Sequence, residues 1–390
     1  MAEGGISLRG GAVLNLYKHG PRYRAGESMP NIARSIIRDS LQAKPDEAIV
    51  IQAGTQSVDL AKQVAIEAYK VGADPAIFLD TDETFFGQFK YLSEDQLRNT
   101  SAHCLGIADY VDSYVYMGGV EDPAPMSRVP QSKWSALFQG EDAHRRKNIE
   151  KNQKQVGVAL GAVTRARAKT YGFAYDKWKR TTEAAIAVDY KAMRRTADVL
   201  AAMFRRPAEV RVKADDGTNL RFRLAGEMRT PHVDDGVISE EDLADRNPTT
   251  SLPAGAVFVA PIETSANGAF HSDVSIPSVG TLIEGMSWTF RDGRLTDFTA
   301  KKNVKNAQLN YADGTGAKDR FAFFGIGLNK KLIPGYLTSV YAAGVVSAGI
   351  GDNKDLGGDN ESTYGFAGFQ SHATVTIDGK PVVEDGRLVA

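Results

Sequence analysis

The hydrophobic pattern of this chain changes near residue 205, and that change limits the folds it can adopt. In the first part, apolar residues at helical spacing alternate with short apolar runs, which predicts helix, strand, helix and strand over 31–41, 48–52, 57–71 and 75–79. Strands that alternate with helices are typical of a parallel sheet with helices on both faces. We therefore predict a parallel α/β domain over residues 1–165.

The second part alternates apolar and charged residues instead. Glu209–Lys213 and Leu220–Leu224 place apolar side chains on one face and mostly charged ones on the other, as expected of half-buried strands. Asp215–Gly217 between them predicts a hairpin turn. Similar strand and turn units follow at 290–294 and 375–380. We expect a β-rich α+β domain over residues 206–390.

The segment between these two parts has apolar residues at mixed three- and four-residue spacing up to Met203. This spacing predicts a long amphipathic connecting helix over residues 166–205. Pro207 then ends the helical pattern.

The length of the chain agrees with two domains, and its net charge agrees with a protein that has no strong overall electrostatic field. At 390 residues the chain exceeds the usual size of one domain. The net charge of -1 provides no basic field for nucleic acid or for an anionic membrane, so neither is an expected partner. No window approaches the roughly 20 apolar residues that span a bilayer, and we expect a cytoplasmic protein. Its single cysteine, Cys104, excludes an intramolecular disulfide.

A denser signal lies between Leu252 and Asp273, which read LPAGAVFVAPIETSANGAFHSD. This segment resembles the active-site strand of the M29 family of metal-dependent aminopeptidases, N-(L/I)-P-x-(G/E)-E-V-F-x-(A/S)-P. Further matches to the family occur on both sides of this segment and in the family order, at Gly217–Leu220, Thr281–Glu284 and Phe290–Lys302. The resemblance implies an M29 aminopeptidase-like fold, with a Rossmann-like N-terminal domain, and a homodimer or higher homo-oligomer.

The same resemblance implies a dinuclear metal site made of two glutamates, two histidines and an aspartate, donors suited to zinc, cobalt or manganese. In this chain Ala256 stands in the first glutamate position and Phe323 in the second. Ser347 stands in the first histidine position. Of the family's H-x-D pair, His372 remains and Thr374 replaces the aspartate. We expect the metal site to be degenerate, because a lone imidazole cannot hold a catalytic ion.

Two other H-x-D pairs offer a substitute site. His232 and Asp234 form one, and His271 and Asp273 form the other. Residues two apart on a strand face the same side, so His271 and Asp273 with His372 would make a two-histidine, one-carboxylate set of the kind that holds iron(II). Such a set would suit the dihydroxypyridine dioxygenases, a distant branch of the same fold that this chain also resembles.

Three hypotheses about function remain open, and whether the chain is an enzyme stays undecided. The first is a protein that has lost most metal ligands, needs no cofactor, and binds a peptide or small polar ligand in the retained cleft, as an accessory protein of a biosynthetic pathway. The second is an active metal-dependent aminopeptidase or hydrolase that uses Zn, Mn or Co. The third is an Fe(II)-dependent ring-cleaving dioxygenase. The expected cleft also includes Glu263, which follows Pro261 and would pair with a ligand's amine.

Overall fold

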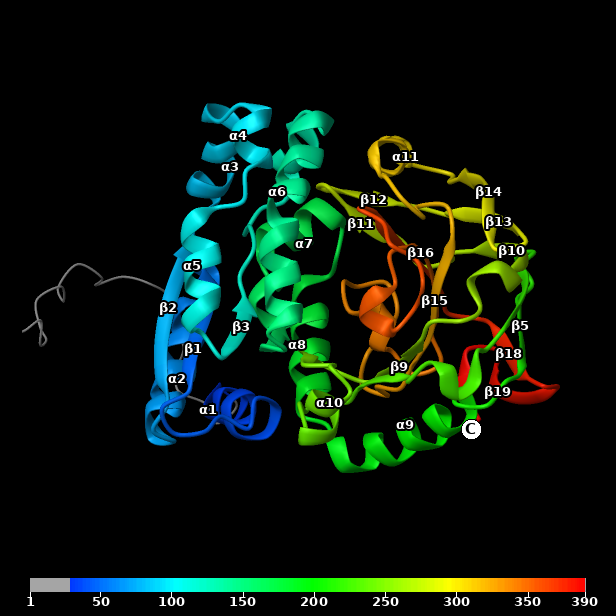
Figure 1. The fold of residues 1–390 in the computed structure, drawn as a ribbon, viewed down its shortest axis with the longest axis horizontal. Coiled ribbons are helices and arrows are strands. Elements are labelled where there is room, and N and C mark those ends of the chain that lie inside the picture. Colours follow the sequence, from blue (N-terminus) through cyan, green and yellow to red (C-terminus); the bar gives the residue numbers. More distant parts are fainter. Residues whose placement is uncertain (1–28, 390) are drawn as a thin grey trace, which may run out of the picture.

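The computed structural model describes residues 29–389 and divides into two halves that lie side by side (Figure 1). One half contains a parallel sheet covered by helices, and the other is built mainly from antiparallel strands. This arrangement confirms the predicted fold class, a parallel α/β domain followed by a β-rich domain. None of the helices within the described residues has the length and apolar character that a membrane crossing requires.

The parallel sheet, sheet A, has five strands in the described part of the chain, in the order β2-β1-β3-β4-β8. They are β1 (Ala48–Gly54), β2 (Asp74–Asp80), β3 (Ser113–Met117), β4 (Lys154–Val158) and β8 (Thr249–Leu252). Parallel neighbours need long crossover connections, and the connecting helices here are α2 (Val58–Lys70), α3 (Asp82–Tyr91), α4 (Glu94–Arg98), α5 (Ala102–Tyr110) and α6 (Gln131–Glu150). The fifth strand, β8, comes from beyond the predicted boundary near residue 205.

One face of sheet A packs against α1 (Met29–Arg34), the π-helix η1 (Ser35–Ser40) and α2. Ile37 and Val64 from these helices are fully buried against Ile51 and Val115 of the sheet. Alternation along β3 turns Tyr114 and Tyr116 to the opposite face, where their rings stack 5.6 Å apart. The opposite face of β3 is therefore aromatic, whereas its first face is aliphatic.

The prediction of a single long helix over residues 166–205 is wrong. The segment forms three helices, α7 (Arg165–Tyr171), α8 (Tyr175–Ile186) and α9 (Tyr190–Phe204). Gly172 ends α7 in the left-handed conformation, with φ of 68°. Asp189 begins α9, because its side chain accepts a hydrogen bond from the backbone of Ala192 at 3.0 Å. Apolar spacing continued across both breaks, so periodicity alone did not reveal these capping residues.

The β-rich half contains two large antiparallel sheets in the described residues. Sheet B has eight strands in the order β14-β13-β10-β6-β5-β18-β19-β20; these are β5 (Glu209–Lys213), β6 (Asn219–Arg223), β10 (Asn267–His271), β13 (Ser287–Arg291), β14 (Arg294–Thr299), β18 (Thr374–Ile377), β19 (Lys380–Glu384) and β20 (Arg387–Leu388). Sheet C has the order β17-β16-β15-β9-β7; these are β7 (His232–Asp234), β9 (Ala256–Val259), β15 (Phe321–Gly327), β16 (Val346–Gly351) and β17 (Gly365–Gln370).

Smaller elements complete this half of the molecule. They are α10 (Glu240–Ala244), α11 (Lys305–Asp313) and the short ribbon of β11 (Ile276–Ser278) and β12 (Thr281–Ile283). The predicted hairpin turn at Asp215–Gly217 is confirmed, because β5 and β6 pair antiparallel around it.

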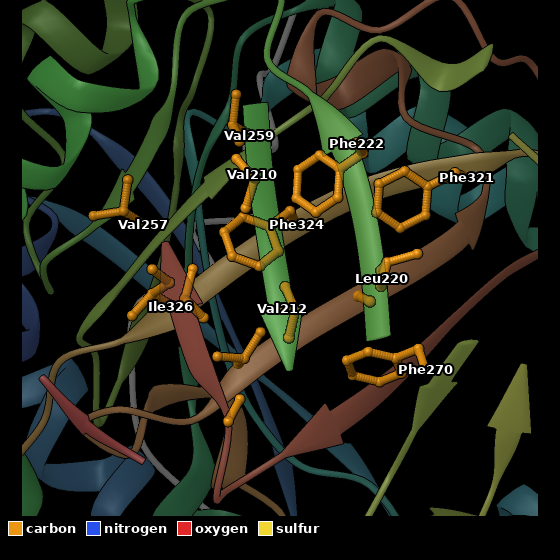
Figure 2. Close-up of a cluster of buried hydrophobic side chains, with 14 of the residues drawn as sticks. Val210, Val212, Leu220, Phe222, Val257, Val259, Phe270, Phe321, Phe324 and Ile326 are labelled. Atoms are coloured by element: carbon orange, nitrogen blue, oxygen red, sulfur yellow. The ribbon is translucent and has the colours of Figure 1, made fainter. Parts of the chain in front are cut away.

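Sheets B and C share one apolar core, shown in Figure 2. Val212 and Phe222 from sheet B point toward Val257, Phe324 and Ile326 from sheet C. Phe324 is completely buried, and its ring lies 5.0 Å from that of Phe222. Because side chains alternate along each strand, this core uses one face of sheet C and leaves the other face for a different role.

Replacing Phe324 by alanine is expected to lower the free energy of unfolding by about 3–5 kcal/mol, because a fully buried ring is lost and a cavity remains. Denaturant unfolding followed by tryptophan fluorescence checks this, since Trp288 belongs to the same core. Exposed Arg221 on β6 supplies the control, and Arg221→Ala should change the free energy by less than about 0.5 kcal/mol. Equal effects of the two substitutions would contradict the assigned core.

Candidate functional site

The face of sheet C that points away from the core forms the candidate site. Its cross-strand neighbours are fixed by register: His232 pairs with Phe258, and Asp234 pairs with Ala256. Phe258 pairs in turn with Gly325 on β15, and Gly325 with Ser347 on β16. Ala256, Phe323 and Ser347, three of the positions predicted for the cleft, therefore lie on this one face.

A pocket of about 260 Å³ lies between this face and strand β8 of sheet A, and we call it the interdomain pocket. Sheet C, β8, the 3-10 helix η7 (Ser339–Tyr341) and the 3-10 helix η8 (Lys354–Leu356) supply its walls. The lining residues are His232, Asp234, Thr249, Thr250, Ser251, Phe258, Phe323, Tyr341 and Leu356. Both halves of the molecule thus contribute to one hollow.

Aromatic rings cover the floor of the pocket. The rings of Phe258 and Phe323 lie 6.1 Å apart and nearly perpendicular, and His232 stacks on Phe258 at 6.0 Å. Glycines make room for both phenyl rings. A Cβ at Gly325 would lie 2.4 Å from the ring of Phe258, and one at Gly349 would lie 2.0 Å from the ring of Phe323. The rings therefore occupy space that side chains at 325 and 349 would otherwise take.

Next to these rings, Ser347 has a buried hydroxyl. The residue is 1% exposed, and its Oγ has no hydrogen-bond partner within the described residues. An unpaired buried hydroxyl costs free energy. The unpaired hydroxyl of Ser347 thus lowers stability locally, at one of the positions where the family resemblance places a metal ligand.

Asp234 supplies the pocket's carboxylate. The residue is 4% exposed, and its Oδ1 accepts hydrogen bonds from the Thr250 hydroxyl at 2.6 Å and from the Ser251 amide at 3.1 Å. The Tyr341 hydroxyl donates to Ser251 Oγ at 2.8 Å. Burial, followed by the charge of Asp234, raises the pKa of Tyr341 well above its usual value. Tyr341 is therefore a neutral hydrogen-bond donor at physiological pH.

A second hollow of about 220 Å³ adjoins the interdomain pocket and shares His232 and Leu356 with it. Its walls carry charges of both signs, with Arg194, Arg205 and Arg229 facing the carboxylates of α10 and Asp355. Cavities of this size are smaller than those that hold drug-sized molecules. The pair of hollows therefore suits a small or slender ligand.

Glu263 does not line the pocket. Its carboxylate forms a bidentate pair with Arg229, with Nη1 to Oε1 at 2.7 Å and Nη2 to Oε2 at 2.9 Å. The Asp359 amide and the Asn353 side chain also donate to Oε1, at 2.8 and 3.0 Å. Burial acts to raise the pKa of Glu263, but the donors led by Arg229 outweigh it, and the pKa lies below its usual value. Glu263 thus anchors the loop that carries Leu356.

The remaining predicted residues lie away from the pocket. On β17 the residue opposite Ser347 is Phe369, while His372 follows the end of that strand and Thr374 pairs with Lys213 in sheet B. His372 Nδ1 lies 2.8 Å from Asp273 Oδ2, and this contact raises the pKa of the mostly exposed imidazole. His271 lies beside Gly217 in sheet B. Asp273 and His372 therefore meet, but at a place that lines neither hollow.

No group of three or more His, Cys, Asp or Glu among residues 29–389 is placed to hold a metal ion. The substitute set of His271, Asp273 and His372 is therefore not assembled in this structure. His232 and Asp234, the other H-x-D pair, do share the pocket, because residues two apart on a strand face the same side. Sequence reasoning missed Phe258, Leu356 and the β8 residues. Phe258 alone carried a signal, because it shares the strand parity of Ala256.

Comparison with known proteins gives the family and the fold of this chain. The family of thermophilic metalloproteases M29 matches residues 26–318. This match covers more than half of the chain, so the chain belongs to the M29 family. None of the curated proteins matches it.

Two solved structures share the fold. Wild-type AmpT from Thermus thermophilus has a TM-score of 0.72 and 19% identity, covering 93% of this chain and 99% of AmpT. The 2,5-dihydroxypyridine dioxygenase from Pseudomonas putida KT2440 has a TM-score of 0.57 and 11% identity, covering 93% of this chain and 97% of the dioxygenase. At these identities the likeness shows the fold alone.

The metal that the family name implies does not fit the three positions on this face where the family resemblance places its ligands. Ala256, Phe323 and Ser347 offer no carboxylate or imidazole, and two phenyl rings cover the glycines beside them. Divalent zinc, cobalt and manganese bind to imidazole, thiolate and carboxylate donors. The family's dinuclear centre therefore has no donor set at these three positions.

The Glu263 anchor yields a pH-dependent prediction. Glu263→Gln should lower the free energy of unfolding by about 3 kcal/mol at pH 7, because Arg229 loses its buried partner. A carboxyl with a lowered folded-state pKa stabilises the protein above its unfolded pKa and loses that contribution as pH falls through the folded value. The difference from the native chain should therefore shrink below pH 4.5.

Denaturant unfolding across pH 3–8 measures this difference. Glu384→Gln, at the exposed end of β19, is the matched control and should show a small effect with no comparable pH trend. A constant difference across this pH range would argue against an ionised Glu263 as the anchor.

Proposed function

We propose that this chain binds a peptide or small polar ligand in the interdomain pocket without the family's metal centre. The observation that carries the proposal is the aromatic floor. Phe258 and Phe323 fill the face where metal donors are expected, yet a lined hollow of about 260 Å³ remains beside them. Apolar walls with a few placed polar groups are typical of ligand sites.

The polar groups of the pocket support binding over chemistry with an activated water. Asp234, Ser251, Thr250 and Tyr341 form one connected network that fixes each side chain. Fixed polar groups provide orientation and specificity for a ligand. An accessory role in a biosynthetic pathway, in which the chain presents or sequesters its ligand, follows as part of this proposal.

A cytoplasmic location and a homodimeric or higher assembly are part of the same proposal. The family resemblance motivates the expected assembly. Size-exclusion chromatography with light scattering measures the assembly directly, and a monomer across the working concentration range would refute that part.

Metal loading separates the proposal from the two enzyme hypotheses. The full chain, purified without chelator and then supplied with Zn, Mn, Co or Fe(II), is expected to retain far less than one metal ion per chain after desalting. It should also leave aminoacyl amides and 2,5-dihydroxypyridine unchanged. Elemental analysis and product detection give the answer.

Near-stoichiometric metal accompanied by turnover would support an enzyme instead. If the metal is lost in His372→Ala, the metal site lies at the pair of His372 and Asp273. If the metal is lost in His232→Ala, the metal site lies in the pocket. Either result would overturn the proposal.

Ligand binding itself is tested by blocking the pocket. Thr249 lies on the β8 wall, so Thr249→Trp should fill the hollow and abolish the binding of small ligands. Calorimetry with phenylalaninamide and the dipeptide Phe-Gly measures this, and we expect at least a tenfold loss of affinity. The exposed Thr299 on β14 is the matched control, and Thr299→Trp should bind as the native chain does. Equal binding by both variants would place the ligand elsewhere.

A further inference from the structure

One buried carboxylate differs from the others in the described part of the chain. Five carboxylates are buried there: Glu47, Asp234, Asp235, Asp242 and Glu263. Lys154, Arg194 and Arg229 pair with Glu47, Asp235 and Glu263 at 2.7 to 3.1 Å. Asp242 instead belongs to the capping box at the start of α10. Only Asp234 among the five has neither a cationic partner within residues 29–389 nor a helix to cap.

The polar groups that interact with the Asp234 carboxylate, Thr250, Ser251 and Tyr341, are all neutral, so none of them balances its charge. Thr250 and Ser251 both donate to Oδ1, and neither reaches Oδ2. These donors come from β8, so they hold the carboxylate against the wall of the interdomain pocket. A buried charge needs a partner of opposite charge to offset its desolvation.

The aromatic rings of the pocket also favour a positively charged group. His232, Phe258 and Phe323 form a row across three neighbouring strands, and Tyr341 closes the pocket from η7. Faces of aromatic rings attract cations, and aromatic-lined sites of this kind recognise ammonium groups. The phenyl rings also suit the apolar body of a ligand. A cation with an apolar or aromatic body therefore matches both features of the pocket.

We propose that the interdomain pocket selects a small organic cation, with its ammonium group against Asp234 and its apolar body against Phe258 and Phe323. This inference rests on the proposed function, since it names the class of ligand that the same pocket takes. Asp234 is the residue that sets the charge preference. Leu356, on the loop anchored by Glu263, bounds the same space.

Matched probes test the charge preference without any substitution. Phenethylamine carries an ammonium group, and 2-phenylethanol is a neutral molecule of nearly the same shape. By calorimetry at pH 7, the native chain is expected to bind phenethylamine more than about tenfold more tightly than 2-phenylethanol. The dipeptide Phe-Gly is a third probe; tighter binding of the dipeptide than of phenethylamine would assign the cation to a peptide amino terminus, and the reverse order to a free amine.

Two substitutions complete the test. Asp234→Asn should bring the two affinities within about threefold of each other, whereas Asp273→Asn, which removes a carboxylate outside the pocket, should keep the preference. Circular dichroism checks that Asp234→Asn folds. If this variant does not fold, the comparison of the two probes on the native chain still tests the charge preference.

Equal binding of phenethylamine and 2-phenylethanol by the native chain would overturn the charge preference and leave the proposed pocket standing. A preference that persists in folded Asp234→Asn would overturn the role of Asp234. If none of the three probes binds, and Thr249→Trp and the native chain show the same affinity for phenylalaninamide, the proposed function is overturned as well.

Discussion

The short passage of the chain from β8 to β9 fixes the geometry of the whole site. Strand β8 pairs with β4 in sheet A, and only three residues later β9 begins in sheet C. Asp234 on β7 then bonds back to Thr250 and Ser251 of β8. The two halves are thus joined by a tight connection and by buried hydrogen bonds, so the wall and the floor of the pocket are held at a set separation.

Sheet C serves two purposes because its side chains alternate. One face supplies Phe324 and Ile326 to the core shared with sheet B, where fully buried rings provide much of the stability. The other face carries Phe258 and Phe323 into the pocket. A substitution on the first face should act on folding, and a substitution on the second should act on binding. This separation allows the pocket to change its chemistry without loss of the fold.

Local patterns in the sequence predicted the local structure well. The α/β rhythm, the hairpin at Asp215–Gly217 and the strand that carries Ala256 all follow from nearest-neighbour preferences, and the structure contains each of them. The break before α9 was missed, because apolar spacing runs on while the cap depends on the single side chain of Asp189. Membership of the M29 family followed from motifs spaced along the chain, and the family match supports it.

Long-range pairings explain the parts of the site that could not be predicted. Glu263 was expected to meet a ligand, but its partner Arg229 comes from a separate loop, and no local pattern signals that pair. His372 was expected in the cleft, but the strand opposite Ser347 ends before it. The pairing of β8 with β4 joins residues about a hundred positions apart, so sequence gave no sign that Ser251 would line the pocket.

The glycines beneath the phenyl rings also affect how this family member can evolve. A glutamate at position 256 or 323 would not by itself complete the ligand set that the family resemblance places here, because the ring of Phe258 covers Gly325 and position 347 holds a serine. Several replacements would have to occur together, because a side chain at Gly325 or Gly349 would collide with the ring of Phe258 or Phe323. The packing of the rings on these glycines therefore couples the four positions, so that a change at one of them requires changes at the others.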